Sequence, residues 1–130
     1  MNSMILRVKS AKKLDQIARD LEAAAQRNKF GVLGVHDLKA KMNEKGVAFT
    51  RDCLVFEVCN PQQAKSVLEA NAEISTALPC RIAVYTEGDG VTLAALRPAA
   101  LLGMFESREL APIAQEVEAT IVRIMEEAAR

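Results

Sequence analysis

The stretch Cys53-Leu54-Val55-Phe56-Glu57-Val58-Cys59-Asn60-Pro61 decides the fold, because a strand pattern runs directly into a helix start. Side chains of a strand alternate between its two faces, so Leu54, Phe56 and Val58 share one face, which we expect to be core. The other face carries Glu57 with the thiols of Cys53 and Cys59. Asn60 is a strong N-cap, Pro61 suits the first helical position, and Gln63 sits where a capping-box partner would reach back. The stretch therefore predicts a half-buried strand over 53–59 followed at once by a helix.

The chain before this stretch predicts two strand and helix pairs. Residues 4–8 form an apolar-rich strand pattern, and Ser10 is the expected N-cap of the next helix. That helix is indicated by apolar residues that recur at helical spacing from Leu14 onward. Residues 30–36 predict a second strand, after which Asp37 is expected to cap a short helix that ends before Gly46.

The chain after the stretch predicts a helix, a hairpin and a last helix. The helix that starts at Pro61 is expected to end near Asn71. Residues 82–86 and 91–96 then indicate a hairpin across Glu87-Gly88-Asp89-Gly90, since Gly and Asp tolerate the positive φ of such turns. The regular part of the last helix is expected to begin near Leu110, because Pro112 lacks a backbone donor.

The order of these elements predicts the fold class. Strand, helix, strand, short helix, strand, helix, strand, strand and helix follow one another along the chain. This order favours an α+β fold with two layers, in which a largely antiparallel sheet carries its helices on one face. A chain of 130 residues buries roughly two thirds of its unfolded surface, so we expect a single domain over 1–130.

Composition excludes several classes of partner. Lys and Arg number 17, as do Asp and Glu, and the chain has no Trp and one Tyr. It therefore lacks both the basic field and the stacking surface that nucleic-acid binding requires, and we expect no nucleic-acid partner. No apolar run approaches the roughly 20 residues that cross a bilayer, and no signal peptide or disulfide framework is evident. We expect a soluble, cytoplasmic protein with no membrane partner.

Several short motifs follow one another in a fixed order: Phe30-Gly31-Val32-Leu33, Cys59-Asn60-Pro61, Leu68-Glu69-Ala70, Leu78-Pro79-Cys80-Arg81, Val84-Tyr85 and Pro98. Together they resemble the domain of unknown function 302, over most of the chain up to Met104. The resemblance implies a compact α+β domain, often dimeric, mostly bacterial or archaeal, without an established activity. It supplies no residue role that can be carried over to this chain.

Cys59 and Cys80 are the candidates for thiol chemistry. A thiolate at a helix start is stabilised by unpaired amides, which lowers its pKa from about 8.5 and makes it nucleophilic. The alternative for Cys59 is a structural role as a hydrophobic staple that packs on Ala64. Free cysteines generally prefer burial, so the structural role is favoured for both thiols. The sequence leaves open whether the two sulfurs meet.

His36 is the only histidine, so a metal site would have to use it or manage with cysteines and carboxylates, from a set such as His36, Glu57, Cys59 and Cys80. No spacing in the chain is a metal motif, so we expect neither a metal nor another cofactor. His36 is instead expected to bond to backbone near Asp37. A nucleophile elbow, a Walker loop and a dinucleotide fingerprint are also missing, which disfavours hydrolase and nucleotide-dependent functions.

Residues 99–105 carry no polar side chain until Glu106. Such a run is either deeply buried or part of an interface, and we favour the contact of a symmetric homodimer. The candidate interface residues are Leu101, Leu102, Met104 and Phe105.

The leading functional hypothesis is non-enzymatic binding of a small ligand, with an anion as one option. The expected pocket is bordered by the helix start at Cys59, by Cys80 and by Arg81. Asn60 and the amides of the helix start would donate hydrogen bonds, and Arg81 would supply the counter-charge. Glu57 and His36 complete the candidate set. One alternative is a thiol-based redox or sulfur-handling protein that uses Cys59 and Cys80, and another is a structural dimer or adaptor that acts through its apolar surface.

Overall fold

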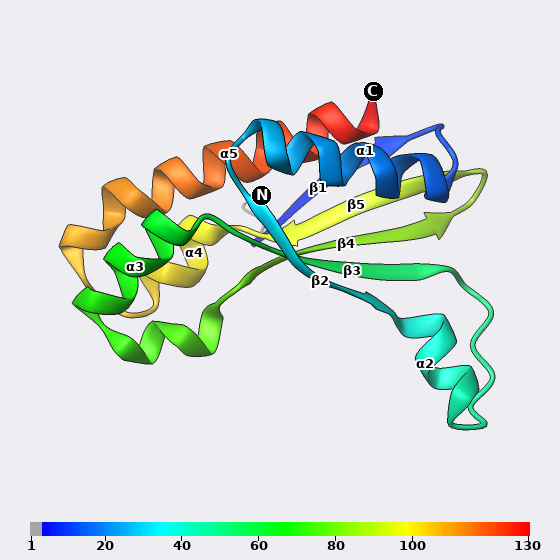
Figure 1. Cartoon of the computed structure of the whole chain (residues 1–130), viewed down its shortest axis with the longest axis horizontal. Coiled ribbons are helices and arrows are strands. Elements are labelled where there is room, and N and C mark those ends of the chain that lie inside the picture. The colour runs from blue at the N-terminus through cyan, green and yellow to red at the C-terminus, as the bar shows by residue number, and fades with distance from the viewer. Residues whose placement is uncertain (1–3) are drawn as a thin grey trace.

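The computed structural model describes residues 4–130 and contains the predicted elements in the predicted order (Figure 1). Its five strands are β1 (Ile5–Ser10), β2 (Gly31–Asp37), β3 (Cys53–Cys59), β4 (Cys80–Glu87) and β5 (Gly90–Leu96). Its α-helices are α1 (Leu14–Arg27), α2 (Leu38–Glu44), α3 (Pro61–Ala70), α4 (Pro98–Gly103) and α5 (Ala111–Ala129). Two short 3-10 helices, η1 (Ala72–Ala77) and η2 (Arg108–Leu110), complete the chain.

The strands form one sheet in the order β1-β5-β4-β3-β2, and every neighbouring pair is antiparallel. The predicted α+β class is therefore confirmed. In the pairing of β3 with β4, Val58 lies opposite Cys80 and Glu57 lies opposite Arg81. Directly opposed residues share a sheet face, so this register places Cys80 on the face of Val58 and Arg81 on the face of Glu57.

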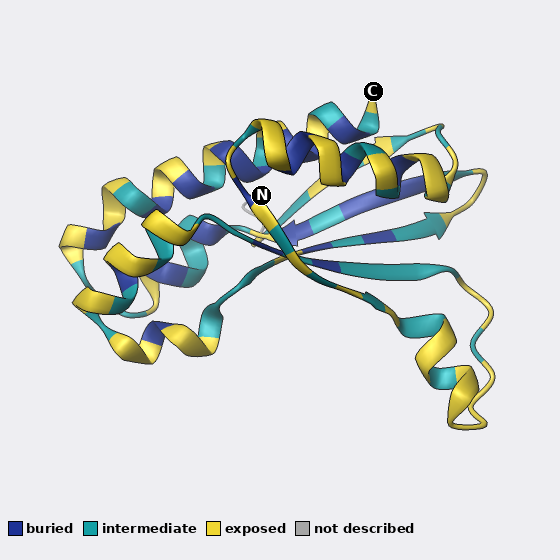
Figure 2. Cartoon of the chain, viewed as in Figure 1, coloured by how far each residue is buried: buried dark blue, intermediate teal, exposed yellow. Residues whose placement is uncertain are grey.

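The main core lies between the sheet and two long helices. Helices α1 and α5 run side by side over one face of the sheet, as Figure 1 shows. Phe56 and Val58 are buried in this core and Leu54 packs against it, which confirms the face predicted from the alternation in β3. The helices contribute the buried residues Ile17, Leu21, Ile121, Ile124 and Met125. The buried sides of α1 and α5 face the strands in Figure 2.

A second, smaller cluster lies where α3, η1 and α4 meet the first turns of α5. Its buried members are Val67, Ile74, Leu102, Leu110 and Ala114. Phe105 and Ala99 pack against this cluster. Within the apolar run over 99–105, Leu102 is buried and Met104 is exposed, so the run as a whole is not deeply buried.

Ser10 does not cap the first helix, contrary to the sequence-based prediction. The N-cap of α1 is Lys13, which makes no side-chain cap bond. The Ser10 hydroxyl instead accepts from the Lys12 amide at 3.1 Å and donates to the Ala129 carbonyl at 2.6 Å. Ser10 thus joins the end of β1 to the last turn of α5, a partner that is 119 residues away in sequence.

Helix α2 and the residues that follow it extend away from the rest of the chain (Figure 1). Asp37 caps this helix by accepting from the Ala40 amide at 2.9 Å, as predicted. Gly46 follows the helix with a φ of 78°, in the left-handed region that favours glycine. None of the residues of α2 is buried, and Figure 2 shows this helix without dark blue.

Candidate functional site

The open face of the sheet ends in a hollow beside α4 and η1. Its outer part is a cavity of about 260 Å³. Most of the lining side chains are apolar: Ile5, Ala77, Pro79, Cys80, Ala83, Ala94, Ala95, Leu96, Pro98 and Leu101. Arg81 is the one charged residue among the lining residues. We call this part the outer cavity.

A smaller inner cavity of about 30 Å³ adjoins the outer cavity. The two cavities share four lining residues, Ala77, Cys80, Pro98 and Leu101, so Cys80 stands between them. The remaining lining residues of the inner cavity are Phe30, Val58, Cys59, Asn60, Gln63, Ala64, Leu78, Leu102 and Val117. The structure thus brings together the predicted residues Cys59, Asn60 and Cys80, and it places Arg81 in the adjoining space.

The start of α3 offers fewer donors than the sequence predicted. The side-chain oxygen of Asn60 accepts from the Gln63 amide at 3.1 Å, which confirms Asn60 as the N-cap. The Ala64 amide donates to the Asn60 carbonyl at 2.9 Å. Pro61 has no N–H group to donate. The backbone amides of Gln63 and Ala64 are thus already bonded, and Pro61 has none to offer. This helix start is therefore a weaker anion site than expected.

Gln63 makes a contact that sequence reasoning missed. The predicted capping box does not form, because the side-chain oxygen of Gln63, which would accept from the Asn60 backbone amide, has no hydrogen-bond partner within residues 4–130. The side-chain nitrogen of Gln63 donates to Glu116 Oε1 of α5 at 3.2 Å. The side-chain oxygen of Gln63 is enclosed by the protein and has no hydrogen-bond donor. Gln63 and Glu116 are 53 residues apart in sequence, so no local pattern could have indicated this bond.

All three cysteines are free thiols and none is activated. Burial raises the pKa of Cys80 to about 11, and the neighbouring Cys59 thiol adds to the increase. Burial also raises the pKa of Cys59, so the helix start does not produce a thiolate there. The pKa of Cys53 is raised as well, chiefly by burial. At neutral pH these thiols are protonated, which makes them poor nucleophiles.

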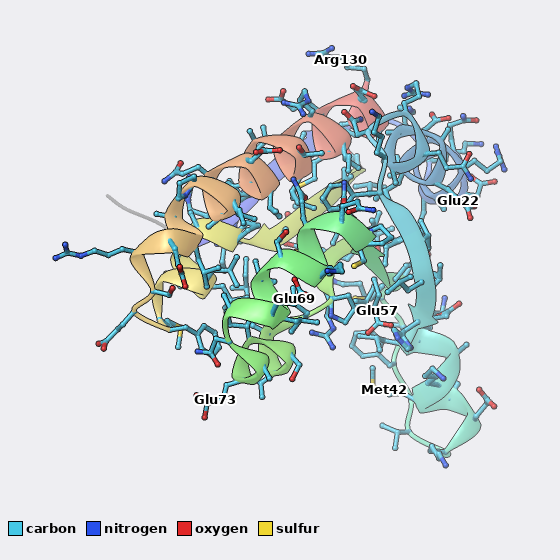
Figure 3. The ribbon with its side chains drawn as sticks, turned by 60° about the vertical axis from the view of Figure 1, so that its left-hand side comes forward. Glu22, Met42, Glu57, Glu69, Glu73 and Arg130 are labelled. Carbon is cyan, nitrogen blue, oxygen red and sulfur yellow. The ribbon has the colours of Figure 1, made fainter. Side chains whose placement is uncertain are left out.

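Glu57, His36 and Arg81 meet on the open face of the sheet. Arg81 Nη2 lies 3.4 Å from Glu57 Oε2, and His36 Nε2 lies 3.2 Å from Glu57 Oε1. The partner of His36 is therefore the Glu57 side chain rather than the backbone near Asp37. Glu57 is labelled in Figure 3, beside the ribbon of β2.

Gly34 of β2 makes room for this group. A Cβ atom at Gly34 would lie 3.2 Å from Glu57 Oε1, which is tighter than most real contacts. A larger residue would therefore push the carboxylate aside. Arg81 belongs both to this charged group and to the lining of the outer cavity, so it connects the two halves of the predicted site.

The four predicted interface residues lie in different surroundings. Leu102 is buried in the second cluster, Phe105 packs against that cluster, and Leu101 lines both cavities. Met104 has a relative exposure of 70%. Met104 is thus the most exposed of the four predicted interface residues.

Residues 4–130 contain neither a metal-binding cluster nor a membrane-spanning helix. In this part of the chain no three side chains of His, Cys, Asp or Glu lie close enough to hold a metal ion. Among the helices between Met4 and Arg130, none combines the length and the apolar character that a bilayer crossing demands.

Comparisons with known proteins are consistent with this fold. The model of the family described as "Domain of unknown function DUF302" matches residues 6–128. Among solved structures, an uncharacterized conserved DUF302 protein from Bacillus stearothermophilus is 29% identical, with a TM-score of 0.93. The match covers 99% of this chain and 100% of that one. No curated protein matched the chain.

Proposed function

This chain belongs to the DUF302 family of domains of unknown function, so its role has to come from its own site, and we propose that it binds a small ligand without catalysing a reaction. The ligand is an apolar molecule with one anionic group. Its apolar part occupies the outer cavity, and its anionic group pairs with Arg81.

The lining of the outer cavity carries this proposal. A cavity of about 260 Å³ with apolar walls favours the apolar part of a small molecule, because contact with these walls removes it from water. A single arginine at such a site favours an anion, since its planar guanidinium bonds carboxylates through two parallel N–H groups. The Arg81 side chain is 55% exposed, so an incoming anion can reach it.

The pairing of Arg81 with Glu57 does not prevent this role. One guanidinium nitrogen faces Glu57 at 3.4 Å. A guanidinium has five N–H donors, so a ligand can share Arg81 with Glu57. The Glu57 carboxylate also repels an incoming anionic ligand. This repulsion limits the affinity of the site for small anions that lack an apolar part.

The thiol alternative has one observation in its favour, namely that Cys59 and Cys80 line the same inner cavity. The raised pKa values of both thiols argue against it, because a redox thiol depends on thiolate at the working pH. Reversible ligand binding is therefore the better-supported function.

Calorimetric titration with straight-chain alkanoates, from butyrate to octanoate, tests the proposal. Alkanols of the same lengths test whether the anion matters. We expect the alkanoates to bind and Arg81→Ala to weaken them about tenfold, the usual worth of a charge-assisted hydrogen bond. Arg108→Ala, an exposed arginine outside both cavities, is the matched control. Unchanged affinity in Arg81→Ala, or binding that chemical-shift mapping places elsewhere, would refute the proposed site.

A further inference from the structure

The Glu57 carboxylate holds two different groups, one on each oxygen. Glu57 Oε2 lies 3.4 Å from Arg81 Nη2, and Glu57 Oε1 lies 3.2 Å from His36 Nε2. The three side chains come from β4, β3 and β2, which are neighbours in the sheet. His36 and Arg81 are thus joined through one carboxylate, so a change of charge at His36 alters the electrostatic field at Arg81.

The packing around Gly34 keeps the carboxylate between its two partners. A Cβ atom at Gly34 would lie 3.2 Å from Glu57 Oε1 and 4.0 Å from His36 Nε2, so both side chains lie close to the backbone of β2. The Glu57 side chain is 21% exposed, and partly buried ion pairs are screened less by salt than exposed ones. The His36 side chain is 42% exposed, so it can exchange protons with water.

His36 is the group in this arrangement whose charge responds to pH near neutrality. It is the only histidine in the chain, and histidine is the side chain whose charge ordinarily changes between pH 5 and pH 8. The arrangement of Arg81, Glu57 and neutral His36 carries no net charge. Protonation of His36 therefore gives these three residues a net charge of about +1.

Other charged groups lie near this end of β2, on α2 and on the segment that follows it. The Asp37 carboxylate accepts from the Ala40 amide, and Lys39 Nζ lies 3.0 Å from Asp52 Oδ1. Arg51 lies over an aromatic ring of β4, 5.8 Å from its centroid. Carboxylates, lysines and arginines ordinarily keep their charge between pH 6 and pH 8. These groups therefore add a constant background to the field of His36 in this range.

We propose that protonation of His36 strengthens the binding of an anion at Arg81. When His36 is neutral, Glu57 offsets the charge of Arg81 and repels the anionic group of the ligand. When His36 is protonated, its charge offsets that of Glu57, and Arg81 attracts the anion more strongly. The chain thus binds its ligand more tightly as the pH falls and releases it as the pH rises. This inference rests on the proposed function, because it takes Arg81 as the partner of the anionic group.

The size of the effect follows from Coulomb's law. Two charges about 8–10 Å apart near a protein surface, in about 0.1 M salt, change each other's binding by roughly threefold. Linkage is reciprocal, so the bound anion must favour the protonated form of His36 by the same factor. The titration midpoint of His36 should therefore rise by about 0.5 pH unit when the ligand is bound.

Two measurements on the full chain test the inference, with the straight-chain alkanoate from butyrate to octanoate that binds most tightly. In calorimetric titration, we expect about two- to threefold tighter binding at pH 6 than at pH 8. In NMR, the single histidine gives one titrating ring signal, whose midpoint should rise as stated above. The pH dependence of binding should disappear in His36→Gln, which can still donate to Glu57 but does not titrate. Lys45→Gln, which removes an exposed charge after α2, is the matched control and should keep it.

The outcomes separate this inference from the proposed function. Equal affinity at pH 6 and pH 8, an unmoved midpoint of His36, or a pH dependence that persists in His36→Gln would each overturn the inference and leave the anion site at Arg81 intact. If no alkanoate binds at either pH, the proposed function and this inference both fail. The NMR titration uses the unmodified protein, so a misfolded His36→Gln would not leave the question open.

Discussion

Replacing Cys80 with alanine should remove a calculable part of the alkaline sensitivity of folding. Burial raises the pKa of Cys80 from 9.0 to about 11. The unfolded chain loses this proton near its ordinary pKa, whereas the folded chain retains it, so the folded state binds more protons between the two values. The free energy of unfolding therefore falls as the pH rises through this window. One pKa unit corresponds to about 1.4 kcal/mol, and the loss between pH 8 and pH 10 is about 1.3 kcal/mol.

Urea unfolding followed by circular dichroism at pH 8 and pH 10 measures this loss. The unmodified protein should lose about 1.3 kcal/mol more than Cys80→Ala over this interval. Cys53→Ala is the matched control, because its thiol is less buried and the positive charge of Arg51 opposes the rise in its pKa. If the unmodified protein and Cys80→Ala lose the same amount, Cys80 is not desolvated as we argue. Fast alkylation of Cys80 near neutral pH would likewise contradict the raised pKa, and it would restore the thiol-based alternative.

Two further predictions concern packing and assembly. Gly90→Ala should lower the free energy of unfolding by about 1–3 kcal/mol, because the added Cβ would lie 2.7 Å from the Ser10 carbonyl oxygen. Gly103→Ala is the control and should not lower it, since a Cβ there has nothing within 4 Å. Equal midpoints of the two variants in chemical denaturation would contradict this prediction. We also predict that the chain forms a homodimer through a surface that includes Met104. Met104→Glu should then reduce the mass measured by light scattering, while Val47→Glu, which alters an exposed residue beyond α2, should not. A folded Met104→Glu variant of unchanged mass would remove this residue from the interface.

Patterns that lie within a few residues of one another predicted most of the fold. The alternation over 53–59 identified the buried face of β3, because the pleat sets the direction of each side chain locally. Asp37 and Asn60 were recognised as caps because a cap bonds an amide only three residues further on. Ser10 was wrongly predicted to be a cap, because its hydroxyl bonds to Ala129, which is 119 residues away in sequence.

The candidate site could be predicted only in part. Cys59, Asn60 and Cys80 were expected together, since a strand end, a helix start and the next strand tend to return to one place. Arg81 was expected beside them, and it does line the adjoining outer cavity. Gln63, by contrast, was assigned to a capping box that does not form, and the sequence contains no sign that its side-chain nitrogen bonds to Glu116.

By itself the sequence determined the order of the elements, the faces of the strands, the caps of α2 and α3 and the resemblance to a family. These properties depend on the spacing of neighbouring residues. Only the tertiary structure decided that Arg81 and His36 both meet Glu57, that burial raises the pKa of the thiols, and that the side-chain nitrogen of Gln63 bonds to Glu116. The physical reason is that burial and cavity shape depend on which distant segments pack together, and here α4, η1 and α5 close a hollow that no single segment contains.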